Sequence, residues 1–389
     1  MGSVMMTALA MVVFQAGNSP VLAFDRQRIG DTTYEACSVC DVNQDGALDI
    51  VSGEYWFEGP QFKTRHKICT LTANEDYFDD FSDYPMDVNG DGYPDIVSGA
   101  WWGQKIEWRE NPKGKPVEWT SHDVAKVGNV ERPCFWDIDG DGVVEVVPNT
   151  PGNVQTIFKL NRDANGKGTG SFTKHVISDV KTGHGLGFGD VNGDGRGDLV
   201  ISSGWFEQPA KPMEQEWPFH KDFDLGASAS VPILVYDVNG DGMNDLIVGM
   251  GHDYGLFWWQ QGRDSDSKAT WTKHAIETKR SQYHDLALAD LDKDGQPELV
   301  TGKRYRAHVG HDPGADDPVG LYYFKIDKGA FKRVTIDYGS PDQHSGSGIY
   351  LWIADVSGNG WKDIVAAGKE GMYLFRNQGP ASQVAAASR

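Results

Sequence analysis

One acidic pattern of nine residues recurs seven times in this chain of 389 residues and limits the fold more than any other feature. Its copies begin at Asp41, Asp87, Asp137, Asp190, Asp237, Asp290 and Asp355. The intervals between them are 46, 50, 53, 47, 53 and 65 residues. A repeat of this length is typical of the four-stranded blades of a β-propeller. We therefore expect an all-β, seven-bladed ring rather than two or three separate domains.

The pattern itself, Asp-x-Asn/Asp-x-Asp-Gly-x-x-Asp/Glu, has the spacing of a calcium loop. Oxygens at positions 1, 3, 5 and 9 converge on one hard cation, and Gly at position 6 permits the sharp turn. Runs such as Leu246–Gly249 after the loops favour strands over the helices of an EF-hand. The expected cofactor is therefore structural Ca²⁺, with up to seven ions. Asp/Asn turns without ions are the alternative, and the seventh copy, with Ser357 and Asn359, is the weakest.

The predicted calcium ligands share these four positions. They are Asp41, Asn43, Asp45, Asp49, Asp87, Asn89, Asp91, Asp95, Asp137, Asp139, Asp141, Glu145, Asp190, Asn192, Asp194, Asp198, Asp237, Asn239, Asp241, Asp245, Asp290, Asp292, Asp294, Glu298, Asp355 and Asp363. The seven loops hold 22 of the 56 Asp and Glu residues. Much of the net charge of −20 thus belongs to the predicted calcium ligands, so it says little about binding partners. A negative net charge also gives no reason to expect nucleic acid as a partner.

The ring is expected to close through its N-terminal strand. Six outer strands can be recognised for seven loops, and the last repeat ends at Gly379 without one. Residues 24–29 match residues 331–336, with Phe, Arg and Ile in the same register. The N-terminal segment should therefore complete the last blade and remove an exposed edge. The predicted propeller spans residues 24–379, with a disordered tail at 380–389.

The N-terminus has the anatomy of an export signal. An apolar run from Val4 to Phe14 precedes Val21-Leu22-Ala23, a small-residue cleavage site. Residues 1–23 are thus predicted to be a signal peptide, and a secreted or periplasmic protein without membrane insertion is expected. A disordered extension is the alternative, because the first residues contain no Lys or Arg. The chain has only four cysteines, too few for a disulfide framework: Cys37, Cys40, Cys69 and Cys134. They could form one disulfide bridge or none.

The histidines divide into repeated and unrepeated positions. His66, His122, His175, His220 and His274 follow an aromatic residue in the outer strands, which indicates a structural role. The other six lie in connections at the ends of strands, and these connections should meet on the rim opposite the acidic loops. They are His184, His252, His284, His308, His311 and His344.

The register of the repeat places further side chains at this rim. Six residues before the first Asp of a loop stand Glu35, Glu131, His184 and His284, which should form a partial ring at the mouth of the channel. Arg132 and Tyr283 adjoin this ring, and a long insertion follows Lys303 and contains His308, His311 and Asp312. The facing connections add Tyr55, Trp101, Trp102, Asp253, Lys303, Arg304 and Lys369. Polar residues that only line a hydrated channel are the structural alternative.

The repeats resemble the FG-GAP/VCBS propeller family over about residues 24–379, a family that includes integrin heads and many secreted bacterial proteins. Fold alone does not give function. The segments Gly183–Arg196 and Gly302–Pro313 are similar to the propeller domain of the aldos-2-ulose dehydratase family. That resemblance implies elimination of water from keto-sugars at the channel mouth. The cupin domains of that family are absent, so the isomerase half of its chemistry should be missing.

These residues could perform a β-elimination, which needs a base for the proton next to a carbonyl and a cation for the enolate oxygen. His184 or His284 is the expected base, and Lys303 and Arg304 would stabilise the enolate. Tyr283 or a further histidine such as His344 would protonate the leaving oxygen, and a divalent metal bound by the histidines could replace the cations. The predicted function is that of a carbohydrate lyase or dehydratase, with a uronate-specific lyase as a variant.

The remaining rim residues are predicted to bind the carbohydrate, with flat rings stacking on sugar faces. They are Glu35, Tyr55, Trp101, Trp102, Glu131, Arg132, His252, Asp253, His308, His311, Asp312 and Lys369. The alternative is a non-catalytic, integrin-like module that binds a glycan or a protein partner.

Overall fold

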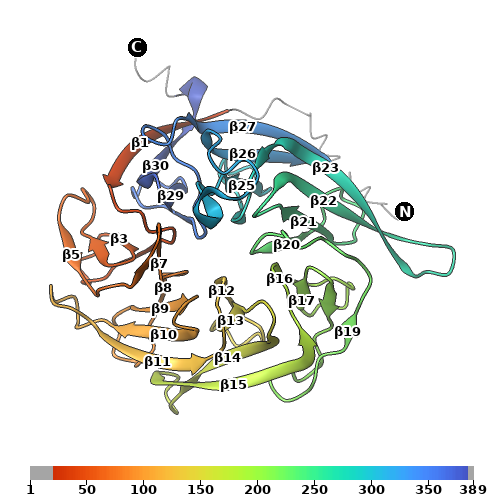
Figure 1. Ribbon diagram of the computed structural model, residues 1–389, viewed down its shortest axis with the longest axis horizontal. Coiled ribbons are helices and arrows are strands. Elements are labelled where there is room, and N and C mark those ends of the chain that lie inside the picture. The colour runs from red at the N-terminus through yellow and green to blue at the C-terminus, as the bar shows by residue number, and fades with distance from the viewer. Residues whose placement is uncertain (1–20, 384–389) are drawn as a thin grey trace, which may run out of the picture.

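The computed structural model describes residues 21–383 as an all-β, propeller-like ring of antiparallel sheets around a common axis (Figure 1). The predicted signal peptide therefore lies almost entirely outside the described residues, as does the end of the predicted tail, residues 384–389. No helix in residues 21–383 is long and apolar enough to cross a membrane.

The sheets follow one another along the chain, and in all but the last, which β1 completes, the strand nearest the axis comes first (Figure 1). The first contains β2 (Ser38–Cys40), β3 (Asp49–Ser52), β4 (Tyr55–Phe57) and β5 (Arg65–Lys67). After the hairpin of β6 (Ala73–Asn74) and β7 (Tyr77–Phe78) come β8 (Tyr84–Met86), β9 (Asp95–Ala100), β10 (Lys105–Glu110) and β11 (Thr120–Lys126). The third sheet contains β12 (Arg132–Trp136), β13 (Glu145–Asn149), β14 (Val154–Arg162) and β15 (Gly168–Lys181).

An eight-stranded sheet comes next and consists of two four-stranded halves joined by parallel pairing of β16 with β20. Its strands are β16 (Leu186–Gly189), β17 (Asp198–Ile201), β18 (Gly204–Phe206), β19 (Phe219–His220), β20 (Ile233–Tyr236), β21 (Asp245–Gly249), β22 (Tyr254–Arg263) and β23 (Ala269–Ser281). Then follow β24 (Leu286–Ala289), β25 (Glu298–Gly302), the short 3₁₀ turn η1 (Ala307–Gly310), β26 (Val319–Asp327) and β27 (Ala330–Gly339). The last strands are β28 (Trp352–Ala354), β29 (Asp363–Gly368) and β30 (Gly371–Pro380).

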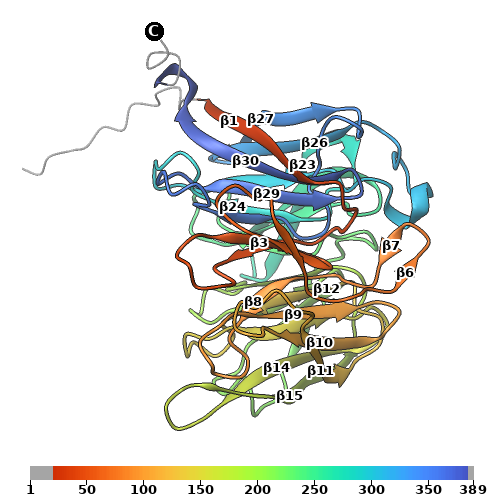
Figure 2. The same ribbon diagram turned by 90° about the vertical axis from the view of Figure 1, so that its left-hand side faces the viewer.

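The N-terminal strand completes the last sheet, as the sequence predicted. Strand β1 (Leu22–Gly30) pairs antiparallel with β30, so the first and last strands of the described residues lie side by side (Figures 1 and 2). Arg26 also forms an ion pair with Asp337 of β27 at 2.8 Å, which ties the closing strand to the neighbouring sheet. Pairing extends outward to Leu22 and Pro380, beyond both predicted limits of the propeller.

The core lies between neighbouring sheets, because their middle strands are buried on both faces. Every residue of β9, β13, β21 and β29 is buried. One cluster combines Val147 and Ile157 of one sheet with Leu199 and Phe206 of the next. Apolar contact of this kind between consecutive sheets favours the ring over isolated blades.

The acidic loops join the first two strands of each sheet and have the turn that the pattern predicts. In all seven, the backbone N–H of the position-6 glycine donates to the Asp at position 1. These glycines have φ between 84° and 93°, a backbone region that side chains disfavour. Since β3 and its equivalents run away from the loops, the turns after them lie on the opposite rim.

The repeated histidines belong to the scaffold. His66, His122, His220 and His274 stack on tryptophans of the adjacent strand, with ring centroids 4.2–4.6 Å apart. His175 has Ile157 opposite it and contacts the carbonyl of Gln215 instead. All four cysteines are free thiols in the structure.

Removal of residues 24–30 should leave the edge of β30 unpaired and cause aggregation, because an exposed strand edge pairs readily with other chains. Size-exclusion chromatography and thermal unfolding would measure this. The matched control is Arg26→Ala, whose partly exposed ion pair should contribute at most about 1 kcal/mol. A monomeric deletion variant of unchanged melting temperature would contradict the closing function of β1.

Candidate functional site

Four unrepeated residues from four different connections meet on the rim opposite the acidic loops. Glu131, His184, His252 and His284 each offer one ligand atom, and these atoms lie within 4.8 Å of one another. Glu131, His184 and His284 precede the innermost strands β12, β16 and β24, at the equivalent positions that the register predicted. His252 follows β21. The repeat thus delivers three of the four groups to the axis.

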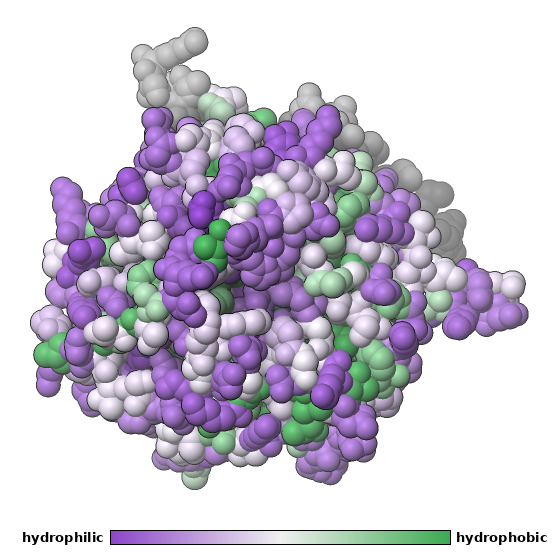
Figure 3. Space-filling view, viewed as in Figure 1, coloured by the Kyte–Doolittle hydropathy of each residue, from purple (hydrophilic) through white to green (hydrophobic). Residues whose placement is uncertain are grey.

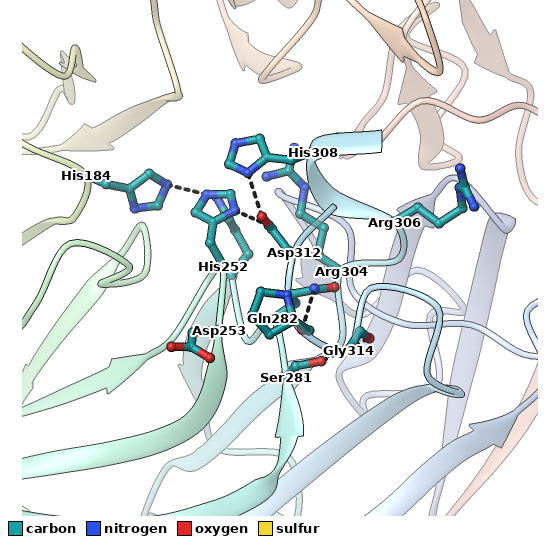
Figure 4. A network of polar contacts seen from close by, with 12 residues as sticks. His184, His252, Asp253, Ser281, Gln282, Arg304, Arg306, His308, Asp312 and Gly314 are labelled. Carbon is teal, nitrogen blue, oxygen red and sulfur yellow. Dashed lines mark hydrogen bonds and ion pairs between the residues drawn. The ribbon is translucent and has the colours of Figure 1, made fainter. Parts of the chain in front are cut away.

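The hydrogen bonds of two of these histidines determine which ring nitrogen carries the proton. His184 Nδ1 lies 2.5 Å from the carbonyl oxygen of Ala229, and His252 Nδ1 lies 2.7 Å from the Asp312 carboxylate. Both partners can only accept, so Nδ1 donates in each ring, and a ring that carries only this proton has a lone pair on Nε2. The two Nε2 atoms face each other at 3.0 Å (Figure 4). Two lone pairs at this distance need a proton or a cation between them.

Asp312 connects this cluster to His308. Its carboxylate accepts from His252 and, at 2.8 Å, from His308 Nδ1, and the two imidazole rings stack with centroids 4.3 Å apart. His252, His308 and Asp312 therefore form a second group whose atoms lie within 4.8 Å. The turn that carries His308 is strained, since Arg306, His308 and Val309 all have φ between 47° and 58°. Such strain persists where the surroundings fix the backbone, often at functional sites.

Fixed charges set the protonation of the cluster. Burial lowers the pKa of His284 well below its usual range and that of His252 to about 4, so both rings are neutral. Burial would raise the pKa of Glu131, but His184 and His284 outweigh it and hold that pKa well below the ordinary value. His284 Nε2 lies 2.9 Å from Glu131, and Arg304 bridges Glu131 at 3.4 Å and Glu35 at 2.9 Å.

An aromatic cavity of about 100 Å³ opens beside this cluster. It is lined by Tyr77, Phe81, Trp101, Trp102, Glu131, Arg304 and His308. Lys369 lies over the Tyr77 ring at 3.4 Å. The hairpin β6–β7 and the turn η1 project on the same side of the ring (Figure 2), where the Tyr77 hydroxyl accepts the N–H of His308 at 2.6 Å. The surrounding face is largely hydrophilic (Figure 3).

Tyr77 was missed by the sequence analysis. It stands in the interval between the first two acidic loops, outside the repeated strands, and no spacing there indicated a hairpin directed at the rim. Trp101, Trp102, His308 and Lys369 were predicted, and the structure brings them to this cavity.

Three of the predicted catalytic residues lie away from the cluster. Tyr283 is fully buried in the apolar core beside Tyr322 and Leu286, because it points away from the axis next to His284. His344 contacts Asp337 and Arg26. Lys303 donates to Ser281, Gln282 and Gly314 and lines a different cavity.

Four predicted binding residues are also placed elsewhere. Arg132 is buried against Asp285, with its guanidinium over the Tyr350 ring. Tyr55 lies under the guanidinium of Arg65, 4.6 Å from the ring centre. Asp253 caps the N–H of Tyr254, and the exposed His311 has no side-chain partner among residues 21–383. Of the predicted bases, His284 is fully buried, and neither His184 nor His284 lines the aromatic cavity.

The acidic loops contain buried carboxylates on the other rim. Burial raises the pKa of Asp49, Asp198 and Asp245 to about 6 and that of Asp95 to about 7. Two loops also bring three carboxylates within 4.8 Å of one another, from Asp137, Asp139 and Glu145, and from Asp290, Asp292 and Asp294.

Comparison with known proteins identifies the repeat. The family described as FG-GAP-like repeat matches residues 87–147 and 237–301. Among solved structures, an Agrocybe aegerita lectin, described as specifically recognising non-reducing terminal N-acetylglucosamine, is 14% identical over 90% of this chain and 92% of the lectin, with a TM-score of 0.46. No curated protein matches. The likeness to aldos-2-ulose dehydratase is not confirmed. The chain contains FG-GAP-like repeats in an all-β, propeller-like fold, consistent with the FG-GAP/VCBS propellers.

Proposed function

We propose that Glu131, His184, His252 and His284 hold a divalent metal ion and that the adjoining aromatic cavity binds a carbohydrate. The observation that carries this proposal is the pair of Nε2 atoms 3.0 Å apart, each on a ring whose Nδ1 donates to an acceptor. Metal-bound histidines typically donate their second N–H to a carbonyl or carboxylate in this way. A cation would relieve the repulsion between the two lone pairs.

The donor set indicates the class of metal. Three neutral imidazoles and one carboxylate suit Zn²⁺ or a similar transition metal, whereas Ca²⁺ prefers oxygen ligands. The low pKa values of His252 and Glu131 keep these ligands deprotonated at neutral pH. A bound divalent ion would supply a Lewis acid for a carbonyl oxygen.

The cavity supports a sugar as the ligand. Trp101, Trp102 and Tyr77 offer flat apolar surface, while Glu131, Arg304 and His308 offer charged and polar groups beside it. Sugars present apolar C–H faces and hydroxyl edges, and this combination suits both.

A β-elimination on a keto-sugar or uronate is the reaction that these groups could perform. His308 replaces His184 and His284 as the proposed base, because it lines the cavity with 58% of its side chain exposed. Its hydrogen bond to Asp312 raises the pKa of His308, which favours acceptance of a proton. The C–H electron pair would form the new double bond, and the C–O bond would break as the leaving oxygen takes up the proton that His308 has accepted. Arg304 would stabilise charge on the carbonyl oxygen.

We further propose that the ring is a seven-bladed propeller, with the two halves of the eight-stranded sheet counted as separate blades, and that calcium binds its acidic loops. The copies that begin at Asp41, Asp87, Asp190 and Asp237 fit the ion. Their buried position-9 carboxylates have no Lys, Arg or His within 4.0 Å among the described residues. A divalent ion would compensate this buried negative charge.

Replacement of His184 or His252 by Ala should weaken metal binding at the rim by at least about 100-fold, because each removes a ligand. Co²⁺ added to chelator-treated protein is a suitable probe, since its visible absorption reports histidine coordination. His175→Ala and His274→Ala are the matched controls on outer strands and should bind Co²⁺ like the natural protein. Equal Co²⁺ spectra for all four variants would refute the metal site.

Replacement of His308 by Gln should lower the rate of elimination by about 10²–10⁴-fold, the usual contribution of a general base. Keto-sugars and uronate polysaccharides would be screened by the absorbance of the new conjugated double bond. His175→Gln is the control. If no substrate is consumed while saccharides still bind, the site belongs to a non-catalytic binding module, the alternative considered from the sequence.

A further inference from the structure

Lys303 differs from the other buried cations of the described chain. Arg109, Arg132 and Arg304 each have a carboxylate oxygen within 4.0 Å. Lys303 is only 2% exposed and has no carboxylate within that distance. Its ammonium donates to the Ser281 hydroxyl, the Gln282 side-chain oxygen and the Gly314 carbonyl, all of them neutral. Buried charges are normally paired directly, whereas the carboxylates that act on Lys303, such as that of Asp317, lie beyond this distance. Burial outweighs them and lowers the pKa of Lys303 to about 8.

The ammonium borders a cavity of about 350 Å³ that contains further positive charge. Lys279 and Arg280 line it together with Lys303, and Asp317 is its one acidic lining residue. Glu277, which lies just outside, is paired with both Arg280 and Arg333. In a chain with a net charge of −20, this cavity is locally basic.

Two tyrosines give the cavity an aromatic wall. The Arg280 guanidinium carbon lies 5.3 Å from the ring centres of both Tyr322 and Tyr338, and Tyr338 is 46% exposed. The cavity also lies close to the candidate metal site, because one short segment borders both. Asp312 contacts His252, and two residues later the carbonyl of Gly314 accepts from Lys303.

We propose that this cavity binds the carboxylate of a uronic acid residue, with Lys303 and Arg280 as its cationic partners and Tyr338 beside the sugar ring. The proposal depends on carbohydrate binding at this face but not on the metal, so a Co²⁺ titration of the same variants separates the two. A uronic acid residue bound here would direct the adjacent sugar residues of the same saccharide toward the aromatic cavity.

The test compares binding of methyl glucuronide, methyl glucoside and acetate by calorimetry. The glucuronide should bind most tightly, and Lys303→Met should weaken it by at least about tenfold while leaving the glucoside unchanged, because a buried charge pair is lost. Arg280→Gln provides a second variant should Lys303→Met fail to fold, and exposed Lys332→Met is the control. Equal affinity for glucuronide and glucoside, equal affinity for acetate, or unchanged binding by both variants would overturn the proposal.

A second inference comes from the acidic loops, which are of two kinds. The copies beginning at Asp137 and Asp290 have Asp at position 3 and Glu at position 9, whereas those beginning at Asp41, Asp87, Asp190 and Asp237 have Asn and Asp. The strand residue opposite position 9 changes as well. It is Lys159 or Lys325 in the first kind and Glu58, Glu110, Glu207 or Gln260 in the second.

The two lysines insert their ammonium groups among the loop carboxylates. Lys159 Nζ lies 2.5 Å from Asp139, 2.6 Å from Asp141 and 3.2 Å from Glu145, at positions 3, 5 and 9. Lys325 contacts Asp292 and, at 3.3 Å, Glu298, at positions 3 and 9. These are the oxygens that would ligate calcium. In the other kind of loop, the opposite Glu or Gln contacts the repeated histidine of the outer strand instead.

We infer that Lys159 and Lys325 are internal cations that take the place of calcium in these two loops. Calcium would need the same oxygens at about 2.3–2.6 Å and would lie beside the ammonium. Like charges so close repel strongly, so ion and ammonium exclude each other. Each of these two loops has Asp instead of Asn at position 3 and so carries one more carboxylate than the other kind. The lysine ammonium compensates this additional negative charge.

The number of calcium ions per chain tests this inference. Native mass spectrometry of the calcium-saturated protein should find no more than five, and Lys159→Met and Lys325→Met should each gain one. Lys273→Met, on an outer strand, is the control and should gain none. Measurements in excess calcium keep the variants folded, since the ion replaces the lost charge. Six or seven ions in the natural protein, or no gain in either variant, would refute the inference.

Discussion

The hydrogen bond from the position-6 glycine to the position-1 carboxylate fixes the start of every sheet. It recurs in all seven acidic loops and turns the chain from each innermost strand into the next strand outward. Once these turns are confined to one rim, the remaining connections must meet on the other. The cluster of Glu131, His184 and His284 is thus a consequence of the loops on the far side, because equivalent positions of a ring converge on its axis.

The repeat explains why much of the architecture was predictable. The seven-fold acidic pattern, a glycine that needs positive φ and the match of residues 24–29 to 331–336 can all be read from the sequence, and each led to the observed structure. The convergence of Glu35, Glu131, His184 and His284 followed from register alone. Arg304 bridges Glu35 and Glu131, and both histidines contact Glu131.

The rest depended on side-chain direction, which sequence register does not give for irregular connections. Lys303 and Arg304 are consecutive, yet one turns toward Gly314 and the other toward Glu35, so grouping them was wrong. Tyr283 and His284 diverge in the same way, into the apolar core and toward Glu131. The left-handed turn at residues 306–309 is set by tertiary contacts, including the Tyr77 hydroxyl, and no propensity of its residues predicts it.

The two rims of the ring differ in the side chains that surround their buried carboxylates, and this difference bears on function. The acidic loops concentrate carboxylates, and in the loop that begins at Asp137 the ammonium of Lys159 lies among them. The histidine cluster instead surrounds the ionised carboxylate of Glu131 with imidazole rings, and the single guanidinium of Arg304 is shared between Glu131 and Glu35. The proposed divalent ion would add two positive charges to this site, which would favour an anionic or electron-rich ligand beside it. The cavity lined by Arg304 and His308 is where such a ligand would approach the proposed ion, because Glu131 borders both the cavity and the histidine cluster.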